Sequence, residues 1–166
     1  MTPPFIIIMG VSGCGKTTIA SELADALDGT YLEGDSFHPP ENKAKMGQGI
    51  PLDDEDRRPW FDILIAAAQK TIASEKSAVL SCSALKKDYR DYLFDRFDNF
   101  RLVYLAGSFE LIKSRMDARD HEYMTSDLLK SQFETFEEPT ASEHLLTISI
   151  EKSPAEILEE IQQWLS

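Results

Sequence analysis

A phosphate-loop pattern near the start of the chain constrains its fold more than any other feature. The eight residues from Gly10 to Thr17 read Gly-Val-Ser-Gly-Cys-Gly-Lys-Thr and match the pattern Gly-x-x-x-x-Gly-Lys-Ser/Thr. The apolar run before them, Phe5 to Met9, predicts a strand buried on both faces, and residues 17–27 carry apolar side chains at helical spacing. This order predicts a loop whose backbone N–H groups surround a phosphate at a helix N-terminus.

The residues of this loop predict a nucleotide site. We expect the Lys16 ammonium group to bridge the β- and γ-phosphates and the Thr17 hydroxyl to bind Mg²⁺. Cys14 admits two interpretations, because the positive potential of the loop lowers the pKa of its thiol, or the residue is a small spacer that supplies only a backbone N–H. The predicted nucleotide-binding residues of the loop are Gly10, Val11, Ser12, Gly13, Cys14, Gly15, Lys16, Thr17 and Thr18.

The rest of the chain alternates short apolar runs with amphipathic stretches. We expect strands at residues 30–33, 77–82, 100–105 and 144–150, and helices at 60–73, 86–97, 109–119, 126–137 and from Ser153 to about Trp164. This alternation predicts an α/β fold with a five-stranded parallel sheet and helices on both faces, in one domain that spans residues 1–166. Residues 34–59 are rich in Gly, Pro, Asp and Asn and predict a long irregular segment with one short helix at about 41–46, which in a compact domain is usually functional.

The composition limits the partners of the chain. Asp and Glu number 29 against 17 Lys and Arg, and the formal net charge of -12 disfavours attraction to a nucleic acid or to an anionic membrane. No apolar run approaches the roughly 18 residues of a membrane-spanning helix. The two cysteines, Cys14 and Cys82, are too few for a disulfide scaffold and favour a cytoplasmic location. Any phosphate chemistry therefore requires local clusters of basic residues.

Two carboxylates lie at the carboxyl end of the second expected strand, in the sequence Glu33-Gly34-Asp35. Ligands of open α/β sheets bind at the carboxyl ends of the strands, where these residues lie. Both acids are candidates to hold Mg²⁺ through a water molecule, and one of them is expected to accept the proton of an attacking hydroxyl. The alternative is a pair of acids on a solvated surface, but the phosphate loop favours the functional interpretation.

Four further blocks of the sequence resemble the gluconokinase family. They occur in the family's order and are residues 34–46, 49–60, 81–91 and 131–139. The most distinctive parts are His-Pro-x-x-Asn at residues 38–42 and Asp-Arg-x-Pro-Trp at residues 56–60. With the phosphate loop, the resemblance covers nearly the whole chain.

The resemblance implies the ATP-dependent phosphorylation of D-gluconate at its 6-hydroxyl, which gives 6-phosphogluconate and ADP and feeds the pentose phosphate pathway. It also implies a homodimer, ATP and Mg²⁺ as cofactors, and a fold similar to that of nucleoside monophosphate and shikimate kinases. By position, Asp35 is the expected base or orienter of the 6-hydroxyl. The residues expected to bind the substrate are Asp35, His38, Lys45, Arg57, Lys86, Arg90 and Gln132.

An anionic substrate that gains a phosphate requires fixed cations, which supports this set independently. A guanidinium group holds a carboxylate through two hydrogen bonds, so Arg57 is the first choice for the gluconate carboxylate, with Lys86 and Arg90 as competitors. Alternatively, the helix at 86–97 carries its basic residues on a solvated face. His38 has the alternative of a hydrogen bond to the loop backbone.

A basic helix end predicts a lid over the nucleotide at about residues 119–126. Arg115 and Arg119 are four residues apart on one helical face, as in related kinases whose lid arginines stabilise the transferring phosphoryl group. With Lys16 and Asp35, they complete the set of expected catalytic residues. The alternative is a pair of surface arginines bound to Glu110 or Asp117. The family commonly has His-Phe in its lid, whereas this chain has His121 one position early, followed by Glu122-Tyr123.

Two other functions remain open from the sequence. One is a shikimate or other small-acid kinase with the same fold, since only the acceptor blocks distinguish the two. The other is a nucleotide-binding module without turnover, against which Lys16, Thr17, Asp35 and the arginine pair argue.

Overall fold

The computed structural model describes residues 2–11, 13–119, 126–141 and 144–166. Its elements in chain order are β1 (Phe5–Met9), α1 (Lys16–Ala26), β2 (Thr30–Glu33), the 3-10 helix η1 (Gly34–Phe37), α2 (Pro40–Gly47), α3 (Asp54–Ala73), β3 (Ala78–Ser81), α4 (Lys87–Phe94), β4 (Phe100–Ala106), α5 (Phe109–Arg119), α6 (Ser126–Thr135), β5 (Leu145–Ser149) and α7 (Pro154–Leu165).

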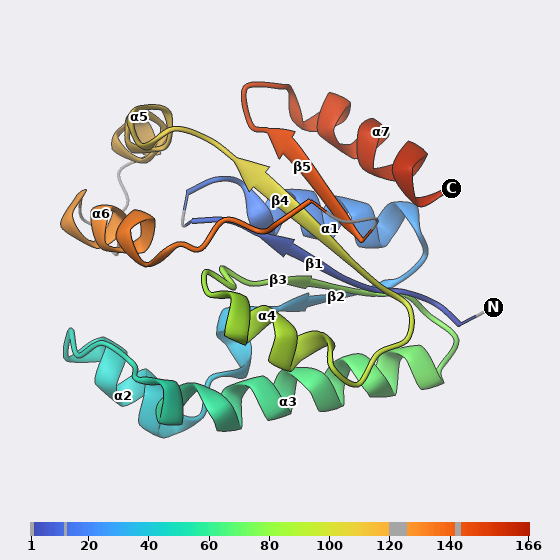
Figure 1. The fold of residues 1–166 in the computed structure, drawn as a ribbon, viewed down its shortest axis with the longest axis horizontal. Coiled ribbons are helices and arrows are strands. Elements are labelled where there is room, and N and C mark those ends of the chain that lie inside the picture. Colours follow the sequence, from blue (N-terminus) through green and yellow to red (C-terminus); the bar gives the residue numbers. More distant parts are fainter. Residues whose placement is uncertain (1, 12, 120–125, 142–143) are drawn as a thin grey trace.

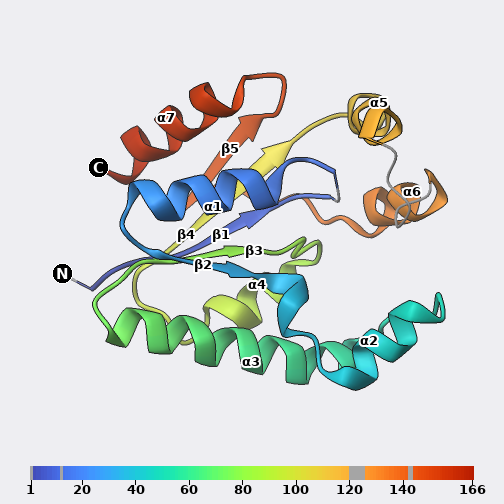
Figure 2. The same ribbon diagram turned by 180° about the vertical axis from the view of Figure 1, so that it is seen from behind.

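The five strands form one parallel sheet in the order β2-β3-β1-β4-β5, which confirms the predicted α/β class. Because all strands run in one direction, the loop after β1, the acids after β2 and the residues after β3 reach the same edge of the sheet. Figures 1 and 2 both show α2, α5 and α6 beyond this edge. A ligand site is expected there, since the strand order reverses at β1.

The central strand β1 explains why the sheet is covered on both faces. Its five side chains are fully buried: Phe5, Ile7 and Met9 pack in a core cluster with α3 and α4, while Ile6 and Ile8 pack in a second cluster with α1, α5 and α7. Figures 1 and 2 show α3 and α4 on one side of the sheet, with α1 and α7 on the other. The predicted strand buried on both faces is confirmed.

The two largest differences from the predicted helix boundaries are the start of α3 and the end of α4, whereas the other boundaries agree within two residues. Helix α3 begins at Asp54 rather than Trp60, because Asp53 and Asp56 form a capping box in which each side chain accepts the other's backbone N–H. Pro59 lies inside the helix and removes only one hydrogen-bond donor. Helix α4 ends at Phe94, three residues before the expected end, where Phe97 N donates to the Phe94 carbonyl.

Within the described residues, no helix is long and apolar enough to cross a membrane.

Candidate active site

The phosphate loop presents a helix N-terminus that is open to an anion. Gly15 caps α1 with a left-handed φ of 96°, a conformation that glycine adopts without strain, and as a glycine it offers no side chain to cap the first turn. The first turn also contains no acidic residue, so the helix dipole favours negative charge there. Lys16 Nζ donates to the carbonyls of Gly10 at 3.0 Å and Val11 at 3.2 Å, while Thr17 and Thr18 are exposed. Ser12 lies outside the described residues.

Cys14 is a spacer rather than a reactive thiol. Its side chain is buried in the cluster under α1, and burial raises the pKa of the thiol while Lys16 opposes the shift only in part. The interpretation of a lowered pKa is therefore wrong. Cys82, after β3, is also buried, and its pKa rises to about 11.

The two predicted acids are held at the sheet edge by the glycine between them. Gly34 is buried so tightly that a Cβ atom there would lie 2.5 Å from the Ser81 carbonyl oxygen of β3. Its own carbonyl accepts a 2.8 Å hydrogen bond from Trp60 Nε1. Glu33 and Asp35 project from this fixed point, and the Asp35 side chain is 93% exposed.

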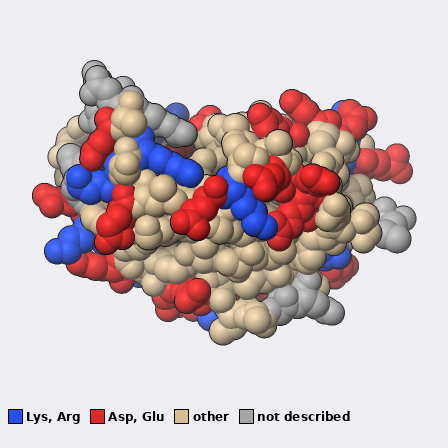
Figure 3. All heavy atoms as spheres, turned by 90° about the horizontal axis from the view of Figure 1, so that it is seen from above, with Lys and Arg blue, Asp and Glu red and all other residues tan. Residues whose placement is uncertain are grey.

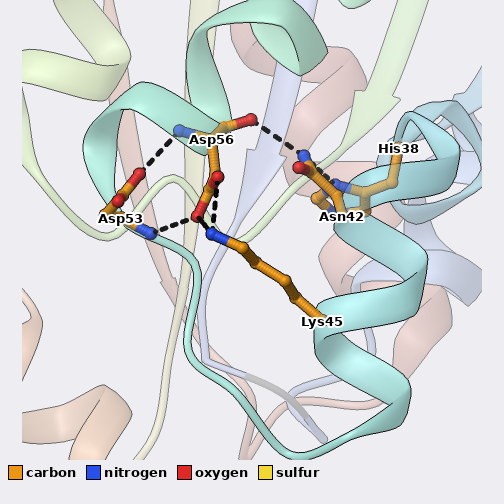
Figure 4. A network of polar contacts seen from close by, with 5 residues as sticks. All are labelled: His38, Asn42, Lys45, Asp53 and Asp56. Carbon is orange, nitrogen blue, oxygen red and sulfur yellow. Dashed lines mark hydrogen bonds and ion pairs between the residues drawn. The ribbon is translucent and has the colours of Figure 1, made fainter.

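Side chains of α2 and α3 form a polar network beside these acids, shown in Figure 4. Lys45 Nζ donates to both carboxylate oxygens of Asp56 at 2.8 and 2.9 Å, and this contact lowers the pKa of Asp56 and raises that of Lys45. Asn42 Nδ2 lies 2.9 Å from the Asp56 carbonyl and 3.3 Å from His38 Nδ1. The His38 Nε2 atom lies 4.0 Å from Asp35 Oδ1.

A second cluster joins α3 to α4 through Tyr89. Arg57 donates to the Tyr89 hydroxyl at 2.9 Å, and this hydroxyl donates to Asp54 at 2.7 Å. The Arg57 guanidinium and the Lys86 ammonium group lie 5.1 and 5.4 Å from the centre of the Tyr89 ring. The Tyr89 hydrogen bond, followed by the Lys86 charge, lowers the pKa of Asp54. Tyr89 is not among the predicted site residues. It lies three residues after Lys86, and in the helix predicted over 86–97 this spacing places both on one face.

The Arg90 side chain is buried and makes hydrogen bonds to the backbone. It is 4% exposed, and it donates to the backbone carbonyls of Ala84 at 2.8 Å and Glu137 at 2.7 Å. Its guanidinium therefore ties the loop after β3 to the segment after α6. This contradicts the solvated-face alternative for Arg90, while Lys87 does lie on the surface, where it pairs with Asp91. Gln132 is half-buried on α6.

The arginines of α5 are described in part. Arg115 donates to the Ile150 carbonyl at 2.7 Å, just after β5, and Asp117 pairs with Lys113 at 3.0 Å. The Arg119 side chain and the predicted lid, including His121, Glu122 and Tyr123, lie outside the described residues.

The sheet topology shows how these groups are arranged. Strand β3 lies between β1 and β2, so Lys16, after β1, and Asp35, after β2, lie on either side of the end of β3. The hydrogen bond from Trp60 to the Gly34 carbonyl holds α3, which carries Arg57, beside the end of β2. We call residues 34–60 and 86–90 the acceptor region, since these segments follow β2 and β3 at the same edge of the sheet as the phosphate loop.

The residues of the site fit Mg²⁺ together with a phosphate ligand. Among the described residues, no group of three or more His, Cys, Asp or Glu could hold a metal ion. Thr17, Glu33 and Asp35 offer exposed oxygen ligands, and Mg²⁺ typically combines one or two such ligands with phosphates and water. The donor set therefore fits a magnesium–nucleotide complex.

Acidic side chains spread over the face seen in Figure 3, with basic side chains gathered in a few places between them. Ion pairs such as Lys152–Glu160, at 2.6 Å, account for part of this pattern. Although the net charge is negative, the basic residues on this face lie in local clusters, as the sequence predicted.

Comparisons with known proteins agree with this geometry. Residues 5–139 match the family described as "AAA domain". The "Probable gluconokinase" of Rattus norvegicus is 41% identical over 94% of each chain. The "Thermoresistant gluconokinase" of Escherichia coli is 43% identical over 88% of this chain and 84% of that protein.

Solved structures give the same result. A gluconokinase from Sinorhizobium meliloti 1021 has a TM-score of 0.85 at 40% identity, and the match covers 99% of this chain and 92% of that chain. A shikimate kinase from Aquifex aeolicus, with a TM-score of 0.56 at 16% identity, shares the fold alone.

Proposed function

Because the chain belongs to the gluconokinase family, we propose that it transfers the γ-phosphoryl group of ATP to the 6-hydroxyl of D-gluconate, giving 6-phospho-D-gluconate and ADP. The observation that carries the proposal is the placement of Lys16, Asp35 and Arg57 at one edge of the sheet, after β1, after β2 and on α3. An ammonium group, an exposed carboxylate and a guanidinium group at one edge are suited to the transfer of a phosphoryl group to a sugar acid.

The transfer is a direct displacement. The Asp35 carboxylate accepts the proton as the O–H bond of the 6-hydroxyl breaks. The hydroxyl oxygen forms a bond to the γ-phosphorus, and the bond from that phosphorus to the bridging oxygen of ADP breaks, so no covalent enzyme intermediate is needed. Lys16 binds the β- and γ-phosphates. Thr17, and Glu33 and Asp35 through water, would hold Mg²⁺, which would neutralise phosphate charge.

The acceptor region binds the sugar acid. Arg57 is the proposed partner of the gluconate carboxylate, because its guanidinium is half-buried and fixed by Tyr89, and Lys86 lies over the same ring. Lys45 is a further proposed member, and it shares its ammonium group with the Asp56 carboxylate. Arg90 is omitted from this set, since its terminal nitrogens are bonded to backbone carbonyls. His38 and Gln132 remain proposed members.

Four further features belong to the proposal. Arg115 and Arg119 stabilise the transferring phosphoryl group when a lid at about residues 119–126 closes. The chain forms one kinase domain, works as a homodimer and acts in the cytoplasm. Support comes from the family and, for the location, from the free thiols of Cys14 and Cys82.

An assay of ADP release tests the proposal. The protein is mixed with Mg-ATP and with D-gluconate, shikimate, D-glucose or a nucleoside monophosphate, and Lys16→Ala controls for contaminating kinases. We expect turnover with D-gluconate that disappears in Lys16→Ala, and poor use of neutral glucose, which leaves the cations of the site unpaired. Turnover of another acceptor without gluconate, or no turnover at all, refutes the proposed substrate.

A further inference from the structure

The His38 ring is held in one orientation by its surroundings. It is 7% exposed and stacks on Trp60 with the ring centres 3.9 Å apart and the planes 20° from parallel. Trp60 also donates its indole N–H to the carbonyl of Gly34, the residue before Asp35. One indole therefore fixes both the histidine ring and the backbone that carries the proposed proton acceptor.

The position of Asn42 decides which nitrogen of His38 carries the proton. Asn42 faces the Asp56 carbonyl at 2.9 Å, and a carbonyl oxygen only accepts hydrogen bonds, so the atom that faces it is the amide nitrogen Nδ2. The same nitrogen lies 3.3 Å from His38 Nδ1 (Figure 4). A hydrogen on Nδ1 would point at an NH₂ group that has no acceptor there.

His38 Nδ1 is therefore the acceptor of this hydrogen bond. This excludes both the tautomer protonated at Nδ1 and the imidazolium form, and it leaves the single ring proton on Nε2. Burial also lowers the pKa of His38, against the charge of Asp35 and together with the charges of Arg57 and Lys43. The neutral ring thus directs an N–H donor towards Asp35, whose Oδ1 lies 4.0 Å from Nε2.

We propose that His38 is a positioning residue, locked by Asn42 in the Nε2–H tautomer, whose Nε2–H donates to the Asp35 carboxylate and orients it towards the substrate hydroxyl. At 4.0 Å the hydrogen bond is not yet formed, and rotation of the exposed Asp35 side chain closes it. One carboxylate oxygen then accepts from His38, and the other faces the hydroxyl. The role of Asp35 rests on the proposed function, whereas the tautomer does not.

Nuclear magnetic resonance of the ¹⁵N-histidine-labelled protein, without any substrate, tests the tautomer. The chain has three histidines, so His38→Gln assigns the His38 signals by their disappearance. At neutral pH we expect long-range ¹H–¹⁵N correlations with an unprotonated Nδ1 and a protonated Nε2. A protonated Nδ1, in either the other tautomer or the imidazolium, overturns the proposal. This result does not depend on gluconate turnover.

Three variants of His38 test the action on Asp35. The amide nitrogen of Gln lies near the place of Nε2, that of Asn lies near Nδ1, and Leu has no donor. We expect kcat with D-gluconate to fall by about 10- to 100-fold in His38→Leu and His38→Asn, and His38→Gln to recover most of it, with KM for ATP unchanged in all three. Thermal unfolding identifies any variant that does not fold. If a variant does not fold, the ¹⁵N-histidine spectrum of the wild type still tests the tautomer of His38.

Two results would overturn the positioning role. Equal kcat in the three folded variants removes the link to Asp35. An increased KM for D-gluconate at unchanged kcat means that His38 only binds the substrate, as a member of the substrate-binding set, and does not position Asp35. If the wild type phosphorylates another acceptor, the proposed function fails, and the same variants are compared with that acceptor.

Discussion

The phosphate loop consists of eight consecutive residues, whereas the acceptor region combines side chains from α2, α3 and α4. Arg57 and Tyr89, for example, are 32 residues apart in the sequence and are joined by a hydrogen bond. The loop binds through backbone N–H groups that a helix start supplies without any side chain. In the acceptor region, Lys45, Lys86 and Arg57 already contact Asp56, Asp54 and Tyr89. The first turn of α1, where a phosphate would bind, contains no acidic residue. A sugar acid, in contrast, must share Lys45 and Lys86 with Asp56 and Asp54.

Asp35, at the start of the acceptor region, carries the largest expected effect. Asp35→Asn keeps the size of the side chain but removes the proton acceptor, so we expect kcat with D-gluconate to fall by about 10²- to 10⁴-fold while KM for ATP stays unchanged. Steady-state kinetics measure both constants. Asp25→Asn, an exposed acid on α1, is the matched control and should behave as wild type. Near-normal turnover of Asp35→Asn would remove Asp35 from its role.

Arg90 tests the structural half of the acceptor region. Arg90→Met leaves the Ala84 and Glu137 carbonyls without their charged donor. We expect the free energy of unfolding to fall by about 2–5 kcal/mol, with KM for D-gluconate unchanged. Denaturant unfolding and kinetics at a temperature where the variant is folded give the two values. An increase in KM without loss of stability would return Arg90 to the substrate-binding set.

Arg57 tests the binding half. Arg57→Ala should raise KM for D-gluconate by about 10- to 150-fold, since a hydrogen bond to a charged group contributes about 1.5–3 kcal/mol. Its neighbour Arg58 is exposed, and Arg58→Ala is the control expected to leave KM unchanged. If the two variants have the same KM, another residue holds the carboxylate.

Substitutions of two glycines test how tightly the backbone next to Asp35 is packed. In Gly34→Ala the new Cβ would lie 2.5 Å from the Ser81 carbonyl, so we expect the free energy of unfolding to fall by about 1–3 kcal/mol. In Gly47→Ala, at the end of α2, nothing lies within 4 Å of the new Cβ, and we expect stability unchanged or higher by up to about 1 kcal/mol. Unfolding midpoints compare them, and equal midpoints would show that the backbone at Gly34 shifts freely.

The smallest expected effect is a pH dependence of stability. Burial lowers the pKa of His38 from its usual 6.5, so the unfolded chain binds this proton more readily than the folded chain. The contribution of His38 is therefore complete above pH 6.5 and is lost as the pH falls through 6.5 towards the folded-state pKa. Between about pH 7 and about pH 5, Tm should fall less in His38→Gln than in wild type. Equal decreases in thermal scans would contradict the buried neutral ring.

The sheet and the phosphate loop were predictable because their signals are local. Strand β2 and helix α5 have the predicted bounds, since periodicity and short apolar runs define them within a few residues. The start of α3 differs from the prediction because the predicted irregular segment extends to Pro59 and the predicted helix begins at Trp60. The spacing of Asp53 and Asp56 was a capping signal for an earlier start. The partner of Arg90 was not predictable, since the Glu137 carbonyl is 47 residues away and only the packed fold brings it near.

Asp56 sets a limit for anyone who redesigns the acceptor specificity of this chain. Its carboxylate caps α3 and holds Lys45, and its carbonyl accepts from Asn42, which in turn contacts His38. Screening libraries that randomise this position would mix two failures in one phenotype, a frayed helix and a freed lysine, because only the carboxylate is lost and the backbone carbonyl remains. Libraries that keep Asp56 and vary Lys45 and Arg57 change the charges that meet the substrate and leave the frame that carries them intact.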